Sequence, residues 1–236
     1  MNAFLDNTLL RAFPVQSQQR LFPQLRLTQL PLGKVIYESG QNVASVYFPT
    51  DSIISLLYVM EDGASAEISV VGNEGLVGIA VFMGGESTPN RAIVQSAGSA
   101  FRLSAAALKQ EFNSEPGIRS LLLRYTQALI AQMAQTAVCN RHHSIDQQLC
   151  RWLLLSLDRL PGNNLTMTQE LIANMLGVRR EGVTEAAGKL QKLQVINYKR
   201  GHITVINRAK LEKLCCECYA VVKSETDRLS VYSSTL

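Results

Sequence analysis

The stretch from Leu165 to Val205 decides the fold of the second half of the chain and reads LTMTQELIANMLGVRREGVTEAAGKLQKLQVINYKRGHITV. It contains two short helical patterns that meet at Gly177. Because glycine reaches the left-handed conformation at little steric cost, Gly177 is expected to end the first helix. Two helices joined by such a tight turn form a helix-turn-helix, whose second helix can enter the major groove of DNA. The apolar residues on the inner faces of the two helices are Leu171, Ile172, Met175 and Leu176, then Val183, Ala187 and Leu190.

A short hairpin with a basic tip follows the two helices. Apolar residues in segments 195–198 and 203–206 flank the turn Lys199-Arg200-Gly201-His202. Such a turn can carry positive charge to the phosphates of DNA, and a helix-turn-helix followed by this kind of wing is a fairly specific pattern. The sequence therefore predicts a winged helix-turn-helix that binds double-stranded DNA.

The polar face of the second helix supplies the candidate base contacts. Arginine can donate two hydrogen bonds to guanine and glutamate can accept one from cytosine, each good pair contributing about 1–3 kcal/mol of discrimination. A solvated polar face is the alternative, and the basic wing favours DNA binding over it. The candidate DNA contacts in the second helix and the wing are Arg179, Arg180, Glu181, Thr184, Glu185, Lys199 and Arg200.

Length and charge indicate two domains with different partners. At 236 residues the chain is long enough for two cores. Residues 1–140 hold 9 Lys and Arg against 10 Asp and Glu, whereas residues 141–236 hold 14 against 9. A basic second half joined to a neutral first half predicts that only the second half meets a polyanion.

The N-terminal residues and the apolar runs give no sign of a membrane or of export. The opening MNAFLDNTLLRAFPVQ has no basic region ahead of an apolar stretch, so we expect no signal peptide here. No apolar run approaches the 18 or more residues that would span a bilayer. We therefore expect a cytoplasmic protein with no membrane partner.

The five cysteines fit reduced thiols better than disulfides or a metal site. They are an odd number and gather late in the chain, at Cys139, Cys150, Cys215, Cys216 and Cys218. Metal sites usually draw ligands from two separated pairs, and three of these cysteines are expected to crowd one helical turn. The adjacent His142 and His143 fit hinge residues better than ligands. No metal site is predicted, and a redox or metal role for the last three cysteines stays open.

Short strands separated by turns fill residues 31–103, which predicts an all-β roll or barrel. An enzyme built on such a barrel, like those of the cupin type, is the alternative from another class. A cupin metal site usually needs two or more histidines, and this region contains no His and no Cys. We therefore predict no catalytic residues and no enzyme. The expected strands cover residues 34–37, 46–48, 53–59, 66–71, 92–95 and 100–103.

A long helix with two apolar faces is expected after the roll. No Gly or Pro interrupts residues 118–141, and a helix of about 25 residues spans roughly 37 Å. One face can cover the roll and the other can meet a second copy of the chain, which predicts a homodimer through the helix over residues 118–136. A helix buried within its own domain is the alternative. The two stripes are Ile118, Leu122, Tyr125, Leu129, Met133 and Thr136, and Leu123, Ile130, Ala134, Ala137 and Val138.

A hinge and a new helix come next. We place the hinge at residues 142–144. Ser144 and Gln147 have the spacing of a capping box, which would start a helix that carries Leu149, Trp152 and Leu153.

This arrangement resembles the Crp/Fnr family of bacterial transcription regulators. The resemblance rests on two passages, Asn140-Arg141-His142-His143-Ser144 with Arg151-Trp152-Leu153-Leu154, and the segment from Leu165 to Val183. It implies an α+β chain with an N-terminal antiparallel β-roll (a double-stranded β-helix of the cyclic-nucleotide-binding type), a long dimerisation helix and a C-terminal winged helix-turn-helix. The implied domains are residues 1–113 for the sensor roll with flanking helices, 114–143 for the long helix and hinge, and 144–236 for DNA binding. The implied function is a homodimeric regulator that reads a pseudo-palindromic operator, modulated by a signal at the roll.

The resemblance assigns roles to individual DNA contacts. Arg180 and Glu181 match the family residues that contact bases, and Thr168 matches a Thr or Ser that starts the first helix and touches a phosphate. Glu185 stands where well-known members often have a second basic residue, so the preferred operator is expected to differ. Arg179 stands where Ser or Thr often caps the second helix, and its side chain cannot accept a backbone hydrogen bond.

The sensor half departs further from the family. Members that bind cyclic nucleotides carry a Gly-Glu pair and then an Arg followed by a small residue. Gly78, Arg91 and Ala92 match parts of that pattern, but Ile79 replaces the Glu, and Met133 on the long helix offers no hydroxyl for a base. Cyclic-nucleotide binding is disfavoured and no cofactor is predicted. Arg91 could instead hold another anion or pair with a surface carboxylate. A regulator with no small-molecule effector and a contact with RNA polymerase both stay open.

Overall fold

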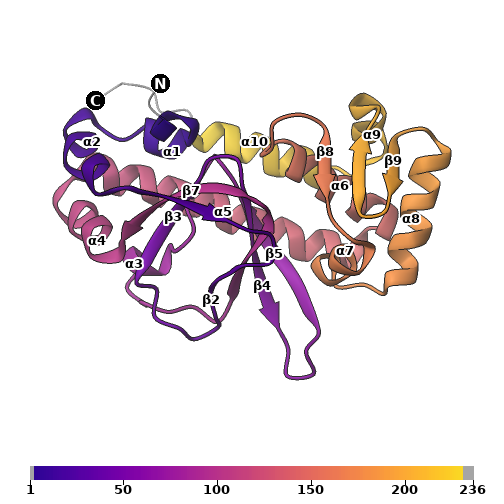
Figure 1. The fold of residues 1–236 in the computed structure, drawn as a ribbon, viewed down its shortest axis with the longest axis horizontal. Coiled ribbons are helices and arrows are strands. Elements are labelled where there is room, and N and C mark those ends of the chain that lie inside the picture. Colours follow the sequence, from indigo (N-terminus) through magenta and orange to yellow (C-terminus); the bar gives the residue numbers. More distant parts are fainter. Residues whose placement is uncertain (1–2, 231–236) are drawn as a thin grey trace.

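A computed structural model of the chain describes residues 3–230. Figure 1 shows a β-roll and a winged domain joined by one long helix, α5 (Pro116–His142), with the C-terminal helix α10 (Cys218–Ser230) lying along it. Among the described residues, no helix is long and apolar enough to cross a membrane.

The roll consists of two antiparallel sheets, with strand orders β1-β7-β3 and β2-β6-β4-β5. Their inner faces form one apolar core, in which Val46, Phe48 and Ile54 are fully buried. The predicted antiparallel roll is confirmed, and each predicted strand overlaps an observed one. The strands are β1 (Arg26–Leu30), β2 (Val35–Tyr37), β3 (Ser45–Pro49), β4 (Ile53–Val59), β5 (Ser65–Val71), β6 (Arg91–Ser96) and β7 (Gly98–Ser104).

Strand β1 lies outside the strands that the sequence predicts, which begin at residue 34. Of its five residues only Leu30 is buried, so the strand has almost no hydrophobic signal of its own. It forms because it pairs with β7, from Arg26 opposite Arg102 to Leu30 opposite Gly98.

Short helices pack against the core of the roll. The guanidinium of Arg20 binds Glu111, with 2.5 Å between Nη2 and Oε1, and joins the N-terminal helices to α4. Ser104 caps α4 by accepting a hydrogen bond from the backbone of Ala107. The helical segments are η1 (Ala3–Asp6), α1 (Thr8–Arg11), α2 (Val15–Leu21), η2 (Phe22–Gln24), α3 (Ala80–Met83) and α4 (Ala105–Ser114).

Helix α5 has one buried and one exposed apolar face, as the sequence predicts. Ile118, Leu122 and Leu129 are buried against the roll. On the other face Leu123, Ile130 and Val138 are 46%, 55% and 49% exposed. The alternative of a helix buried on all sides within its own domain is therefore wrong for the single chain.

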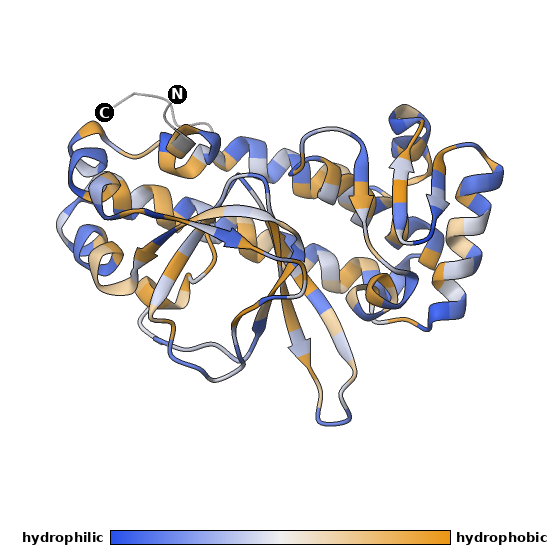
Figure 2. Ribbon diagram, viewed as in Figure 1, coloured by the Kyte–Doolittle hydropathy of each residue, from blue (hydrophilic) through white to orange (hydrophobic). Residues whose placement is uncertain are grey.

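The winged domain begins at the capping box of Ser144 and Gln147, which the structure confirms. Its three-stranded sheet has the order β8-β10-β9, and Figure 2 shows hydrophobic and hydrophilic residues alternating along β9 and β10. The short strand β8 was not predicted. The elements are α6 (Ile145–Leu157), β8 (Asn164–Thr166), α7 (Gln169–Leu176), α8 (Arg180–Lys192), β9 (Ile196–Lys199), β10 (His202–Val205) and α9 (Arg208–Leu214), followed by α10.

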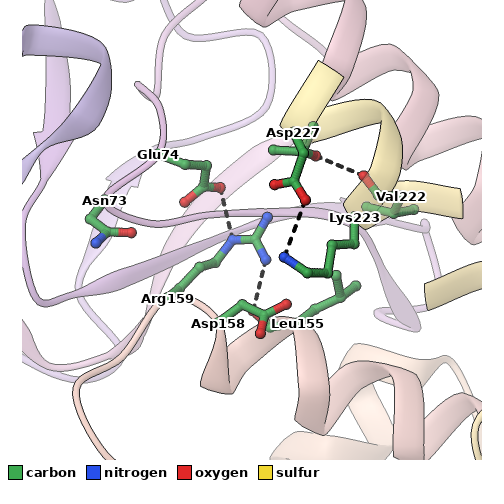
Figure 3. A pocket seen from close by; sticks show the side chains of 9 residues that line it. Asn73, Glu74, Leu155, Asp158, Arg159, Val222, Lys223 and Asp227 are labelled. Carbon is green, nitrogen blue, oxygen red and sulfur yellow. Dashed lines mark hydrogen bonds and ion pairs between the residues drawn. The ribbon is translucent and has the colours of Figure 1, made fainter. Parts of the chain in front are cut away.

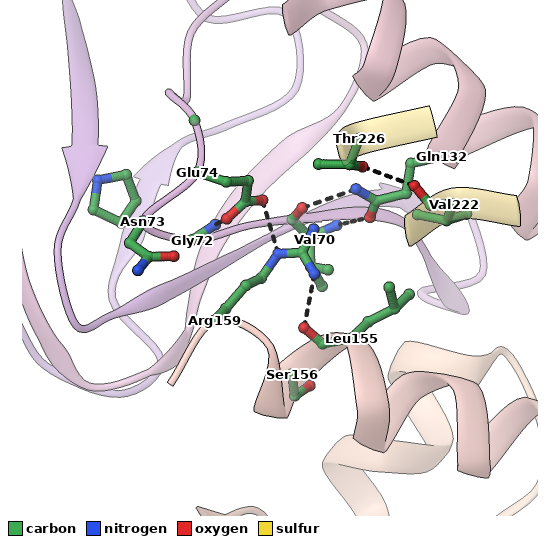
Figure 4. Close-up of polar contacts among 12 residues, drawn as sticks. Val70, Gly72, Asn73, Glu74, Gln132, Leu155, Ser156, Arg159, Val222 and Thr226 are labelled. Atoms are coloured by element: carbon green, nitrogen blue, oxygen red, sulfur yellow. Dashed lines mark hydrogen bonds and ion pairs between the residues drawn. The ribbon is translucent and has the colours of Figure 1, made fainter. Parts of the chain in front are cut away.

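The roll and the winged domain share a buried contact, which we call the domain interface. Ile53, Leu57 and Val70 of the roll belong to the apolar core of the winged domain. At its edge Arg159 Nε lies 2.8 Å from Glu74 Oε1. Beside it, the amide of Gln132 on α5 bonds both backbone groups of Val70 in β5 (Figure 4). A small pocket of about 140 Å³ opens beside Arg159, between α6 and α10 (Figure 3).

Candidate nucleic-acid interface

The helix-turn-helix has the geometry that its sequence predicts. Thr168 caps α7 by accepting a hydrogen bond from the backbone of Leu171 at 3.2 Å. Gly177 ends α7 in the left-handed conformation, with φ of 65°. Helix α8 starts three residues later, with Arg179 at its N-cap position and no side-chain cap bond there in the described structure. Val183, Ala187 and Leu190 are buried beneath α8, so its opposite face is free for a partner.

The wing is a tight hairpin whose turn residues are Arg200 and Gly201. Both have positive φ, 50° and 81°, and Lys199 pairs with His202 across the turn. The twist of such a turn matches that of the flanking strands. Tyr198 fastens the wing to the start of the helix-turn-helix, because its hydroxyl donates to the carbonyl of Met167 at 2.8 Å. The basic tip therefore has a fixed position beside α7 and α8.

The wing, the start of α7 and the start of α8 enclose one open groove of about 480 Å³, which we call the reading groove. Its positive charges are Arg180 from α8 and Arg200 from the wing, which line the same hollow. The sequence analysis did not predict DNA contacts at Gln169, Glu170, Tyr198 or Gly201. The lining residues are Thr168, Gln169, Glu170, Arg180, Tyr198, Arg200 and Gly201.

The predicted DNA contacts outside the groove lining are exposed as well. Glu185 is already paired with Lys189, which also binds Asp146 of α6, each at 3.1 Å. The Thr184 hydroxyl lies 2.8 Å from Gln169 Oε1, so Thr184 links α8 to α7. The exposed predicted contacts are Thr168, Arg179, Arg180, Glu181, Thr184, Glu185, Lys199 and Arg200.

Two glycines of α8 have different surroundings. A Cβ added at Gly182 would lie 2.6 Å from Cδ1 of Ile145, so α8 approaches α6 closely at this point. A Cβ added at Gly188 would meet no described atom within 4 Å. Close helix packing therefore explains Gly182 but not Gly188.

The predicted effector residues of the roll lie in the expected segment, but Arg91 is occupied. Its guanidinium makes two bonds of 2.7 Å to the carboxylate of Glu38, and this contact lowers the pKa of Glu38. Gly78 has φ of 113° and lies close to Val46, and Ala92 is fully buried in β6. Met133 packs against the roll core from α5. Of the two alternatives for Arg91, the structure shows the pair with a surface carboxylate.

The late cysteines do not share a helical turn, so that expectation was wrong. Cys215 follows the end of α9, Cys216 lies in the connection, and Cys218 is the first residue of α10. All five cysteines are free thiols. The fold brings Cys216 and Cys218 to Cys139 and His143 at the end of α5. Sequence spacing alone could not reveal this approach.

Comparisons with known proteins agree with the fold and with the helix-turn-helix domain. Residues 27–115 match the cyclic nucleotide-binding domain, and residues 147–214 match the Crp-like helix-turn-helix domain. The global nitrogen regulator of Synechococcus elongatus is 21% identical over 218 residues, which cover 88% of this chain and 97% of that protein.

Two solved structures share the fold at low identity. FixK2 of Bradyrhizobium japonicum has a TM-score of 0.68 and 16% identity, covering 81% of this chain and 98% of that one. The c-di-GMP-responsive global regulator CLP of Xanthomonas campestris has a TM-score of 0.64 and 15% identity, covering 81% of this chain and 99% of that one.

A β-roll of the cyclic-nucleotide-binding type joined to a winged helix-turn-helix defines a DNA-binding transcription regulator, not an enzyme. The two matched domains together span more than half of the chain, and the chain belongs to the Crp/Fnr family.

Proposed function

We propose that the protein is a homodimer that reads a pseudo-palindromic operator and responds to a signal at its roll. Residues 1–113 would act as the sensor, 114–143 as the dimerisation helix and hinge, and 144–236 as the DNA-binding domain, in the cytoplasm. The observation that carries the proposal is the reading groove, in which Arg180, Arg200 and Thr168 line one hollow beside the recognition helix.

The residues at the start of α8 are the proposed base contacts. Arg180 and Glu181 are exposed at its first turn, where helix-turn-helix proteins reach base edges. Arg179 precedes them at the N-cap position, and its side chain is exposed, so we expect its guanidinium to turn toward DNA. Glu185 is held by Lys189. A carboxylate can only accept hydrogen bonds. We therefore expect Glu185 to alter the operator preference by disfavouring bases that present only hydrogen-bond acceptors to it.

The wing tip and the start of α7 supply the proposed phosphate contacts. Lys199 and Arg200 at the wing tip carry two positive charges, and Thr168 lies beside the tip, with its Cγ2 3.8 Å from a Cβ built at Gly201. Phosphate contacts fix the register of the protein on DNA and make its affinity fall with salt.

The exposed stripe of α5 supports a dimer. Leu123, Ile130 and Val138 lie on one face of a helix whose other face covers the roll. Apolar side chains in such a row are typical of a protein interface. A two-fold dimer would place two recognition helices on half-sites about one helical turn apart.

The signal at the roll is proposed to be something other than the phosphate of a cyclic nucleotide. Such a phosphate would have to displace Glu38 from Arg91. Regulation without a small molecule, and a contact with RNA polymerase, are further possibilities that the same fold allows.

A fluorescence-anisotropy titration of palindromic promoter fragments against random DNA, at several salt concentrations, tests the proposal. We expect two chains per duplex, tighter binding to one palindrome, and a loss of about 5- to 150-fold with Arg180→Ala. The matched control is Lys213→Ala, which removes an exposed charge from α9, at the far end of β10 from the wing turn (Figure 1). Binding no tighter than to random DNA, with Arg180→Ala and Lys213→Ala alike, would refute the proposal.

A further inference from the structure

Four metal-ligating side chains meet where α5 ends and α10 begins. The Sγ atoms of Cys139, Cys216 and Cys218 and a ring nitrogen of His143 all lie within 4.8 Å of one another. The three cysteines are buried and His143 is half-buried. The reading groove uses none of them.

Two local structures bring these four residues together. Cys139 and His143 are one helical turn apart, and the backbone N–H of His143 donates to the carbonyl of Cys139 at 3.0 Å, so both side chains leave α5 on one face. Cys216 and Cys218 flank Glu217 where the chain turns from α9 into α10. The cluster is thus composed of two separated pairs, the usual arrangement in structural zinc sites.

We propose that Cys139, His143, Cys216 and Cys218 bind one zinc ion. Zinc–sulfur bonds of about 2.3 Å and zinc–nitrogen bonds of about 2.0–2.1 Å in a tetrahedron give sulfur–sulfur edges of about 3.8 Å and sulfur–nitrogen edges of about 3.5 Å. The distance from Cys139 Sγ to Cys216 Sγ is 3.6 Å, and that from Cys218 Sγ to His143 Nδ1 is 3.4 Å. Both distances already match the edges of such a tetrahedron.

The residues around these four side chains favour metal-bound thiolates and imidazole over free thiols. The second ring nitrogen of His143, Nε2, lies 3.4 Å from Glu217 Oε2, so a carboxylate can orient the imidazole with Nδ1 toward the cluster. Gln135 Nε2 donates to Cys218 Sγ at 3.0 Å, a contact that stabilises a thiolate. Metal-bound histidines and thiolates usually have such partners.

A buried arginine supplies the charge balance. Three thiolates and a neutral imidazole around Zn²⁺ carry a net charge of −1. Arg151 is 4% exposed and packs against α5 within one helical turn of Cys139. Its Nη1 donates to Thr136, but no acceptor among the described residues reaches its Nε. A zinc–thiolate centre would place a negative charge beside the buried Arg151 cation. Each thiol would release its proton as the zinc–sulfur bond forms.

The compact spacing favours a single ion over an iron–sulfur cubane. The ligands of a cubane bind separate iron atoms, so their sulfur atoms stand farther apart than those around one zinc. The zinc ion would join the last turn of α5 to the first turn of α10. These turns lie on either side of residues 144–215, so the ion would hold the winged domain in a fixed orientation relative to α5.

Metal analysis of the full-length chain, purified under reducing conditions without chelators, tests the site. We expect one zinc per chain in the native protein and little in Cys216→Ser and Cys218→Ser. The matched controls are Cys215→Ser and Cys150→Ser, which remove neighbouring thiols outside the four and should keep one zinc per chain. Metal-free native protein, or equal loss of zinc in Cys215→Ser, overturns the proposal, as does iron with acid-labile sulfide.

A second measurement, cobalt binding to the native apoprotein, keeps all four proposed ligands. Co²⁺ added to the reduced apoprotein should saturate at one ion per chain with the strong visible bands of a tetrahedral thiolate site. Glu217→Gln should keep those bands and weaken zinc affinity about 10- to 100-fold in competition with a chelator. Removal of zinc should lower the melting temperature by roughly 10 °C. Octahedral cobalt bands, or a melting temperature unaffected by chelation, would contradict the proposal.

Discussion

The reading groove and the domain interface are built in opposite ways. The groove takes its residues from one continuous stretch, 168–201, and leaves most of their polar ends exposed. The domain interface takes its residues from separated segments and pairs the buried charge of Arg159 internally, with Glu74 and the Leu155 carbonyl. Changes in the groove should therefore alter DNA affinity at constant stability, whereas changes in the interface should alter stability first.

The largest effect is expected from Arg159→Ala at the interface. The Arg159 side chain is 6% exposed, that of Glu74 is 20% exposed, and Figure 4 shows their bond beside Gly72. Removing one partner leaves a largely buried charge unpaired, which costs about 3–5 kcal/mol in the free energy of unfolding. Urea denaturation of the purified protein measures this loss.

Lys223→Ala is the matched control for that experiment. Lys223 lines the same pocket and pairs with Asp227, but the two side chains are 50% and 66% exposed (Figure 3). Exposed pairs contribute about 0–1 kcal/mol. Equal losses for Arg159→Ala and Lys223→Ala would show that the domain interface is not a stabilising contact.

A buried carboxyl group makes the interface sensitive to pH. Burial raises the pKa of Glu67 to about 7, and the hydrogen bond from Ser55 and the charges of Arg151 and Arg159 only partly oppose this shift. Ser55 has one hydroxyl proton but two acceptors in reach, Glu67 Oε2 at 2.5 Å and Gln95 Oε1 at 2.7 Å. A protonated Glu67 resolves the conflict by donating to Ser55, which then donates to Gln95. The Gln95 amide donates in turn to Ser156 of α6 at 3.0 Å.

The free energy of unfolding should therefore decrease as pH rises from about 4.5 to about 7. The folded protein binds the Glu67 proton more tightly than the unfolded chain, whose carboxyl has its usual pKa of 4.5. The contribution is fully present below pH 4.5 and lost above about 7, with a magnitude on the order of 3 kcal/mol. Urea titrations across this range should show a flatter profile for Glu67→Gln, because glutamine imitates the protonated acid. The control is Glu61→Gln at the hydrophilic tip of the β4–β5 hairpin (Figure 2), and identical profiles for native protein and Glu67→Gln would contradict the assignment.

These two regions also differ in how far sequence patterns could predict them. The reading groove depends on local rules: a helical spacing of apolar residues, a glycine between two helices and a basic two-residue turn. Arg180 and Arg200 could therefore be predicted as DNA contacts from the sequence alone. Arg159, Gln132 and Glu67 have partners that only the folded chain brings near.

Contacts between distant segments also explain the features that sequence patterns did not predict. Strand β1 has one buried residue and exists because it pairs with β7. Cys139 and His143 were separated in the sequence from Cys216 and Cys218, and the packing of α10 along α5 brings them together. Periodicity reports which face of an element is buried but not which distant element covers it.

The smallest predicted effects come from two glycines, Gly177 and Gly188, where alanine should act in opposite directions. Gly177 has a φ of 65°, and an added Cβ would lie 3.2 Å from the Cβ of Ala66 in β5. Left-handed alanine costs about 1–2 kcal/mol, so Gly177→Ala should lower the free energy of unfolding by at least that amount. The helix-turn-helix meets the roll at this point, so this cost belongs to both the turn and the domain interface.

Gly188 lies within α8 and is free of those constraints. Its added Cβ would meet no described atom within 4 Å, and alanine in a helix interior is favoured over glycine by about 0.5–1 kcal/mol. Gly188→Ala should therefore raise the free energy of unfolding by that amount and leave the affinity for operator DNA unchanged. Urea denaturation and the anisotropy titration, run on both variants, measure the two quantities together. If Gly188→Ala weakened DNA binding, the far end of α8 would have to approach DNA or the second subunit, and the reading groove would extend beyond the first turns of the helix.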